Sequence, residues 1–188
     1  MNQVLALDIQ GTPRRWISPD EAIFYHATDS VAWHLGEVMV RYHGGMQKDG
    51  RQSYLESTSI LAIKGHGFQP ISKKNVVLSN RTLFGRDLFR CAYCGGHFPN
   101  YKDLSRDHII PTYLGGANVW MNCVTSCKKC NSAKGHKTLK EVGMELLYVP
   151  YIPSHAEALL LQNRNILGDQ MEFLMSKIPK YSRIRSIH

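Results

Sequence analysis

Two Cys-x-x-Cys pairs constrain this chain more than any other feature of its sequence. The pairs are Cys91–Cys94 and Cys127–Cys130, and 32 residues separate them. A Cys-x-x-Cys turn places two sulfur atoms about 3.5–4 Å apart around one ion, and two such turns complete the tetrahedral four-sulfur site that zinc prefers. Such a site has no open position for a substrate. We therefore expect one structural zinc ion per chain, which fastens together the two ends of a small module.

The fifth cysteine, Cys123, falls outside this spacing and is interpreted as a small buried residue. His97, three residues after the first pair, is an alternative ligand for the ion. An odd number of cysteines argues against a framework of disulfide bonds. The spacing therefore favours a metal site over disulfide cross-links.

The positive charge of the chain is concentrated in the segment that holds the cysteines. The formal net charge is +8, from 23 Lys and Arg side chains against 15 Asp and Glu side chains. Residues 71–140 hold twelve basic and three acidic side chains, whereas the two flanks together hold 11 basic and 12 acidic ones. A segment this basic predicts a polyanionic partner.

Composition excludes several other classes of protein. Apolar residues make up 43% of the chain and charged residues 20%, which is typical of a globular protein rather than a disordered one. No apolar run approaches the roughly 18 residues that a membrane helix needs. The N-terminal MNQVLALDIQ lacks the basic start of a signal peptide. We therefore expect a soluble, cytoplasmic protein without a membrane partner.

Helix and strand signals divide the chain into three expected regions: an N-terminal α/β region at 1–72, a central module at 73–140 and a C-terminal helical region at 141–188. In the first region we expect a strand at 4–9, a helix from Ser18 to about Tyr25, strands at 31–35 and 60–63, and an exposed loop at 43–51. In the third, a capping box at Ser154 and apolar residues at helical spacing predict one long helix ending near Ile178, followed by a basic tail that frays.

Between the cysteine pairs, the sequence predicts a strand, a loop, a second strand and a helix. Asp107-His108-Ile109-Ile110-Pro111 is typical of a strand that a proline stops, and 122–126 is typical of a second short strand. A helix is expected to open at 128–134. Adjacent strand residues point to opposite faces, so Asp107 and His108 can share a site only if the strand breaks there.

The same residues carry a resemblance to a known family. The DHIIP run, Gly115-Gly116, Asn122 and the CxxCNxxK run at 127–134 together resemble the zinc-bearing, McrA-like branch of the HNH endonucleases, which are also called ββα-metal or His-Me finger nucleases. The likeness covers roughly residues 88–140. It implies an α+β fold in which a ββα-metal module is stapled by a four-cysteine zinc site. It also implies a metal-dependent DNA endonuclease of a bacterial cell or a phage-infected host, related to restriction or to phage biology.

The resemblance assigns a role to each residue of the motif. His108 would be the general base that activates water, Asp107 and Asn131 would hold a catalytic divalent cation, and Asn122 would hold the loop that orients His108. The chemistry is consistent, because histidine suits a base at neutral pH and carboxylate and amide oxygens are ligands that Mg²⁺ prefers. Many family members have His where this chain has Asn131, so both Mg²⁺ and Mn²⁺ are candidates.

DNA is the expected partner, with a homodimer if both strands are cut. His136, close to the motif, is interpreted as a surface residue rather than part of the site. The alternative hypothesis is a non-catalytic, zinc-stapled nucleic-acid-binding module, but only the nuclease explains why Asp107, His108 and Asn131 occur together. The side chains expected to contact the sugar-phosphate backbone are Arg86, Arg90, Arg106, Lys128, Lys129, Lys134 and Lys137.

Overall fold

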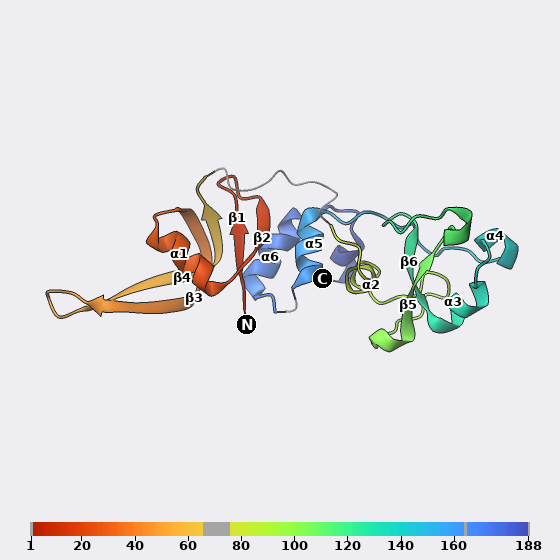
Figure 1. Ribbon diagram of the computed structural model, residues 1–188, viewed down its shortest axis with the longest axis horizontal. Coiled ribbons are helices and arrows are strands. Elements are labelled where there is room, and N and C mark those ends of the chain that lie inside the picture. The colour runs from red at the N-terminus through yellow and green to blue at the C-terminus, as the bar shows by residue number, and fades with distance from the viewer. Residues whose placement is uncertain (1, 66–75, 164, 188) are drawn as a thin grey trace. The chain divides into compact units, whose positions relative to one another are not determined.

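The computed structural model describes residues 2–65, 76–163 and 165–187, and the chain divides into two compact units of mixed α and β structure (Figure 1). Unit 1 comprises Met1–Ser72 and Gln162–Ile178, and unit 2 comprises Lys73–Leu161 and Pro179–His188. The expected boundary between 72 and 73 lies outside the described residues. None of the helices in the described part of the chain is both long enough and apolar enough to cross a membrane.

Unit 1 is built on a four-stranded sheet with the strand order β2-β1-β4-β3. β1 and β4 are parallel, and the other neighbouring strands are antiparallel. All four residues of β1 are fully buried, as an uninterrupted apolar run predicts for a strand covered on both faces. The strands are β1 (Val4–Leu7), β2 (Pro13–Ile17), β3 (Val31–Met46) and β4 (Gln52–Ile63).

Helix α1 (Pro19–Ala27) begins where the sequence predicts. The hydroxyl of Ser18 accepts a hydrogen bond from the Glu21 N–H at 3.1 Å, and Pro19 occupies the first helical position. A proline is tolerated there because its missing N–H would have no partner within the helix. Ala22 joins the apolar cluster on one face of the sheet, so α1 covers that face.

The β3–β4 hairpin is much longer than expected. The expected loop at 43–51 was wrong for its first four residues, because His43 pairs with Tyr54 and Met46 pairs with Gln52 in the ladder. Only the segment 47–51 forms the connection. A two-stranded extension has both faces open to water, so its sequence lacks the apolar alternation that marks a half-buried strand.

The C-terminal region forms two helices, α5 (His155–Gln162) and α6 (Gly168–Lys177), rather than the single helix expected. The two helices belong mainly to different units, so the expected C-terminal region is not a unit of its own. Gln170 of α6 is fully buried, and its side-chain amide donates hydrogen bonds to the carbonyls of Gln3 and Ser59 at 2.7 and 2.8 Å. These bonds hold α6 on the sheet of unit 1, and helical spacing alone gives no sign of them.

Unit 2 contains an antiparallel pair of strands that leads directly into a helix. Asp107 lies opposite Val124 and His108 opposite Cys123 in this pair. The strand and helix positions agree with the expected strand-loop-strand-helix order. The elements are α2 (Asn80–Arg86), β5 (Leu104–His108), β6 (Cys123–Cys127), α3 (Lys128–Lys134) and α4 (Leu139–Val142), with 3-10 turns at Tyr101–Asp103, Thr112–Leu114 and Arg183–Ile187.

The core of unit 2 contains a buried ion pair between Arg86 and Asp87, whose side chains are both 0% exposed. The guanidinium donates to both carboxylate oxygens at 2.8 and 2.9 Å, and also to the carbonyls of Trp120 and Cys123. Asp87 in turn accepts a hydrogen bond from the backbone N–H of Thr125. Arg86 therefore ties α2 to β6, and the expectation that it contacts DNA was wrong because none of its side chain reaches the surface.

The basic tail does not fray in the part that the structure describes. Arg183 donates to the Asp87 carboxylate at 2.6 Å, and the hydroxyl of Ser182 donates to the carboxylate of Glu157. Glu157 is fully buried in α5 and also accepts from the Tyr151 hydroxyl at 2.8 Å. The buried carboxylates of Asp87 and Glu157 thus fix the tail to the rest of unit 2. The sequence of the tail does not show that it has these partners.

We expect Arg86→Met to lower the free energy of unfolding of unit 2 by about 3–5 kcal/mol, because it leaves the Asp87 carboxylate buried with less compensation. Native-state hydrogen exchange of the β5 and β6 amides measures this loss separately from unit 1. Arg90→Met is the control, since Arg90 is exposed and should cost less than about 1 kcal/mol. Equal losses in the two variants would contradict the structural role of Arg86.

Candidate active site and metal centre

The two Cys-x-x-Cys pairs meet at one point in unit 2. The sulfur atoms of Cys91, Cys94, Cys127 and Cys130 all lie within 4.8 Å of one another. A tetrahedral zinc site with Zn–S bonds of about 2.3 Å needs sulfur atoms about 3.8 Å apart, so this group fits a zinc ion after a small adjustment. Cys127 ends β6 and Cys130 lies in the first turn of α3, which places the second pair at a strand-to-helix junction.

The first pair lies in a tight turn whose backbone favours the thiolate form of Cys91. The Gly95 N–H donates to the Cys91 carbonyl, and Gly95 adopts a φ of +71°, a left-handed conformation that favours glycine. Burial raises the pKa of the Cys91 thiol, but hydrogen bonds from the backbone of Cys127, Cys94 and Tyr93 outweigh it and lower the pKa to about 7. The thiolate is the form that binds a metal ion, so this turn suits a metal ligand.

The other two candidate ligands lie outside the cluster. Cys123 is fully buried in the apolar core of unit 2, and its thiol donates to the side-chain oxygen of Asn118 at 3.4 Å. His97 is exposed and is not part of the group of sulfur atoms. The four paired cysteines are therefore sufficient for a tetrahedral site.

The cysteine turn packs on β6 and brings Tyr93 to Asp107. The Ala92 N–H donates to the Thr125 carbonyl at 2.8 Å, and the Tyr93 hydroxyl donates to one carboxylate oxygen of Asp107. Burial and the neighbouring Asp107 both raise the pKa of Tyr93, which therefore stays a neutral hydrogen-bond donor. Sequence reasoning missed Tyr93, because its contact depends on how the turn packs against the sheet.

Lys134 makes the second contact with Asp107. Its ammonium lies 3.0 Å from the other carboxylate oxygen and donates to the His108 carbonyl at 2.8 Å. The two side chains are only 1% and 6% exposed. Lys134 is expected from the sequence to contact a phosphate; in the structure its ammonium is buried against the end of β5, where it pairs with Asp107. The pair joins α3 to the strand that carries the candidate base.

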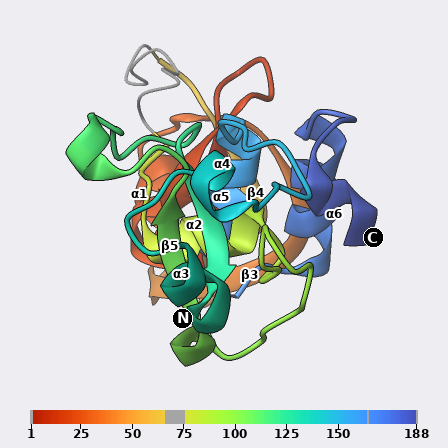
Figure 2. The same cartoon turned by 90° about the vertical axis from the view of Figure 1, so that its right-hand side faces the viewer.

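A pocket of about 260 Å³ opens beside this ion pair. Asp107 and His108 both line it, although both are paired in the β5–β6 ladder and the strand ends only after His108 rather than between them. The Nε2 atom of His108 is buried and has no hydrogen-bond partner among the described residues. Figure 2 views this end of unit 2, where α3 lies beside β5. The pocket is lined by Arg106, Asp107, His108, Pro111, Thr112, Asn131, Lys134, Gly135 and His136.

Asn122 holds the loop that follows β5. Its side-chain amide donates to the carbonyls of Ala117 and Ile110 at 2.9 and 3.1 Å, and its side-chain oxygen accepts from the Ile110 N–H at 2.8 Å. The backbone carbonyl of Asn122 also accepts from the Ile109 N–H. The loop closes so tightly that a Cβ on Gly116 would lie 1.8 Å from the Ile110 oxygen. Asn122 therefore fixes the chain directly after His108.

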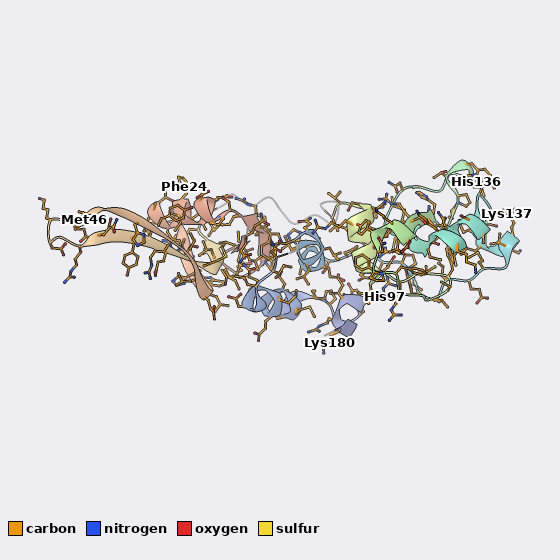
Figure 3. All side chains as sticks on the ribbon, turned by 90° about the horizontal axis from the view of Figure 1, so that it is seen from below. Phe24, Met46, His97, His136, Lys137 and Lys180 are labelled. Carbon is orange, nitrogen blue, oxygen red and sulfur yellow. The ribbon has the colours of Figure 1, made fainter. Side chains whose placement is uncertain are left out.

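Most of the other basic residues expected near the site are accessible. Arg106 is half-buried, lines the pocket, and donates to the side chains of Asn80 and Asn118. His136 also lines the pocket and is exposed, so it lies closer to the candidate site than the sequence suggested (Figure 3). The fully exposed members of the expected set are Arg90, Lys128, Lys129 and Lys137.

Comparison with known proteins identifies the central segment. Residues 91–147 match the sequence model of a family described as HNH endonuclease. The chain is also 26% identical over 113 residues to a protein of Bacillus subtilis (strain 168) named "SPbeta prophage-derived putative HNH endonuclease YoqL". The match covers 53% of this chain and 48% of that protein, so the chain spans about half the length of this relative. No solved structure matches the chain.

We expect elemental analysis of the purified chain to find about one zinc ion per molecule, because four sulfur atoms converge on one point. Cys91→Ala should lower the zinc content and expose the amides of β6 and α3 to hydrogen exchange, since the ion ties the turn to both elements. Cys123→Ala removes a buried thiol outside the cluster and should keep the zinc content unchanged. An equal zinc content in all three proteins would contradict this assignment of the ligands.

Proposed function

We propose that the chain is a metal-dependent endonuclease that hydrolyses phosphodiester bonds of DNA, on the premise that residues 91–147, which match the HNH endonuclease family model, belong to that family. The observation that carries the proposal is one pocket lined by Asp107, His108 and Asn131, next to a cysteine cluster that fits zinc. Hydrolysis of a phosphodiester needs a general base, oxygen ligands for a cation, and a pocket that the phosphate can enter.

His108 acts as the general base in this proposal. His108 lines the pocket and its Nε2 atom has no hydrogen-bond partner among the described residues, so in this proposal that atom takes the proton of the attacking water. The backbone of His108 is held on both sides, by Lys134 at its carbonyl and by Asn122 at the following residues. The fixed backbone limits the directions in which the imidazole can point, which is the positioning that such a base requires.

Asp107 and Asn131 would hold the catalytic Mg²⁺ or Mn²⁺ ion. Such an ion, when bound, offsets the negative charge that develops on the phosphate and on the leaving oxygen. Among the described residues, each carboxylate oxygen of Asp107 accepts one hydrogen bond, one from Tyr93 and the other from Lys134, and a carboxylate oxygen has two acceptor sites. One acceptor site per oxygen is thus left for a cation, and Asn131 offers an amide oxygen from the facing helix.

The cysteine cluster has a structural role in this proposal. A zinc ion bound by the four cysteines would fix the turn that carries Tyr93 and the first turn of α3, which leads to Asn131. It would thereby hold two sides of the hydrolytic pocket at once. None of its ligands lines that pocket, so the ion would not touch the substrate.

DNA would be bound mainly through its phosphates. The exposed Lys128 and Lys129 begin α3, the helix that carries Asn131, and the exposed Lys137 lies three residues after its end. Arg106 lines the pocket itself. Such contacts supply affinity without much sequence preference, and they weaken as salt is added. The surplus of basic residues at 71–140 fits this requirement.

We expect the native chain to nick a supercoiled plasmid in Mg²⁺ or Mn²⁺, and His108→Ala to lower the rate by about 10²–10⁴-fold, because the variant lacks the base. Gel analysis of relaxed circles measures the rate. His97→Ala removes an exposed imidazole outside the pocket and should keep most of the activity. Undiminished cleavage by His108→Ala would refute the base, and DNA binding without any cleavage would favour a non-catalytic nucleic-acid-binding module.

A second expectation concerns Lys134, which competes with a cation for Asp107. In Lys134→Met the carboxylate has lost its positive partner, so Mn²⁺ should raise the melting temperature of this variant more than that of the native chain. Differential scanning calorimetry with and without Mn²⁺ measures both shifts. Asp107→Asn should abolish the shift. Equal Mn²⁺-dependent shifts in all three proteins would show that Asp107 is not the metal ligand.

A further inference from the structure

The β3–β4 hairpin of unit 1 continues past its sheet as a two-stranded ribbon, which we define as residues 37–58, because Leu35 still lies opposite Ile60, a residue that pairs with β1. β1 pairs with β4 only at Ile60, Leu61 and Ala62, so no third strand of the described sheet accompanies the ribbon. Figure 1 shows the two strands running out beyond β1 and β2, and Figure 3 shows Met46 near their far end. An isolated two-stranded hairpin is only marginally stable in water, so an extension of this length calls for a partner.

Large apolar side chains are exposed along the whole ribbon. Tyr42 lies opposite Leu55 on one face, while Tyr54 lies opposite His43 on the other, so both faces carry apolar groups. Exposed apolar side chains that gather on one element are a mark of an interaction surface. The exposed members and their exposed fractions are Val38 (55%), Tyr42 (43%), Met46 (71%), Tyr54 (56%) and Leu55 (40%).

The charge of the ribbon argues against a nucleic acid as this partner. The ribbon carries three basic residues, Arg41, Lys48 and Arg51, and the three acidic residues Glu37, Asp49 and Glu56. Arg41 pairs with Glu56 and lies over the Tyr54 ring, 4.9 Å from its centre. A surface that binds phosphates needs a positive surplus, and this one has none.

The charges are instead arranged so that the ribbon complements itself. Its tip carries Lys48 and Arg51, with a single acid, Asp49, 3.7 Å from Arg51. Its root carries Glu37, whose backbone N–H donates to the carboxylate of Asp169, so two acidic groups gather there. Two ribbons laid antiparallel around a two-fold axis place each basic tip on the acidic root of the other, with the apolar middle between them.

We propose that the ribbon docks on the ribbon of a second copy of this chain, antiparallel and tip to root. The interface is isologous, so Lys48 of each copy faces Glu37 of the other. The role of this dimer in DNA cleavage rests on the proposed function. One hydrolytic pocket per chain cuts one DNA strand, so a dimer with two pockets can cut both strands. The dimer itself is a property of unit 1 and does not depend on catalysis.

Sedimentation velocity of the full native chain at micromolar concentration should show a dimer. Lys48→Glu should weaken it at least tenfold, because it places two acidic groups together at both ends of the interface. Glu37→Lys should do the same, and the chain with both changes should recover the dimer. Lys180→Glu reverses an exposed charge outside the ribbon and should have no effect. A double variant as weak as the single ones would overturn the tip-to-root arrangement.

A shortened ribbon tests the interface without relying on charge. Replacing residues 44–53 by Asn-Gly joins His43 to Tyr54, a ladder pair, through a two-residue turn. This variant should be a monomer with native circular dichroism, and should still nick plasmid while losing any double-strand cutting. The proposal would be overturned if the native chain were a monomer, or if the shortened chain remained a dimer. If the native chain is a monomer and shortening the ribbon lowers its affinity for DNA, the partner of the ribbon is DNA. A native chain that forms the dimer but does not nick plasmid would refute the proposed function and leave the proposed dimer standing.

Discussion

The buried contact between Asp107 and Lys134 is the interaction on which the architecture of the candidate site depends. It joins the last turn of α3 to the end of β5 and, through the second bond of Lys134, fixes the carbonyl of His108. Both side chains are nearly inaccessible, so the loss of either one would leave a buried charge without its partner. The strand that carries the candidate base and the helix that carries Asn131 therefore hold a fixed relation to each other.

The cysteine cluster reaches the same carboxylate from the opposite side. The turn between Cys91 and Cys94 docks on β6 and directs the Tyr93 hydroxyl to Asp107. The second pair lies where β6 passes into α3. A tetrahedral ion at the cluster would thus hold both neighbours of Asp107 in place, which connects the proposed metal site to the candidate hydrolytic pocket. Asn122 completes the arrangement by fixing the loop after His108.

The parts of this site that depend on local chemistry could be predicted from the sequence. Cysteine spacing indicated the cluster, and the short strand pair and α3 followed from turn and helix signals. The burial of Arg86 and Lys134 could not be predicted, because a basic residue has the same sequence signature whether it meets a phosphate or a buried carboxylate. The contact of Tyr93 depends on packing between distant segments. The strand pairing beyond His43 could not be predicted because both faces of the ribbon are exposed, so its sequence lacks the alternation of apolar and polar residues.

The central claim is that the pocket beside Asp107 and His108 performs metal-dependent hydrolysis of DNA. The most direct measurement is the nicking of a supercoiled plasmid by the native chain, first stripped of loosely bound cations and then supplied with Mg²⁺ or Mn²⁺. We expect relaxed circles only after the cation is restored, with zinc still bound to the protein. Intact plasmid with either cation, under conditions in which the chain binds DNA, would contradict it, as would an equal rate in the absence of any added cation.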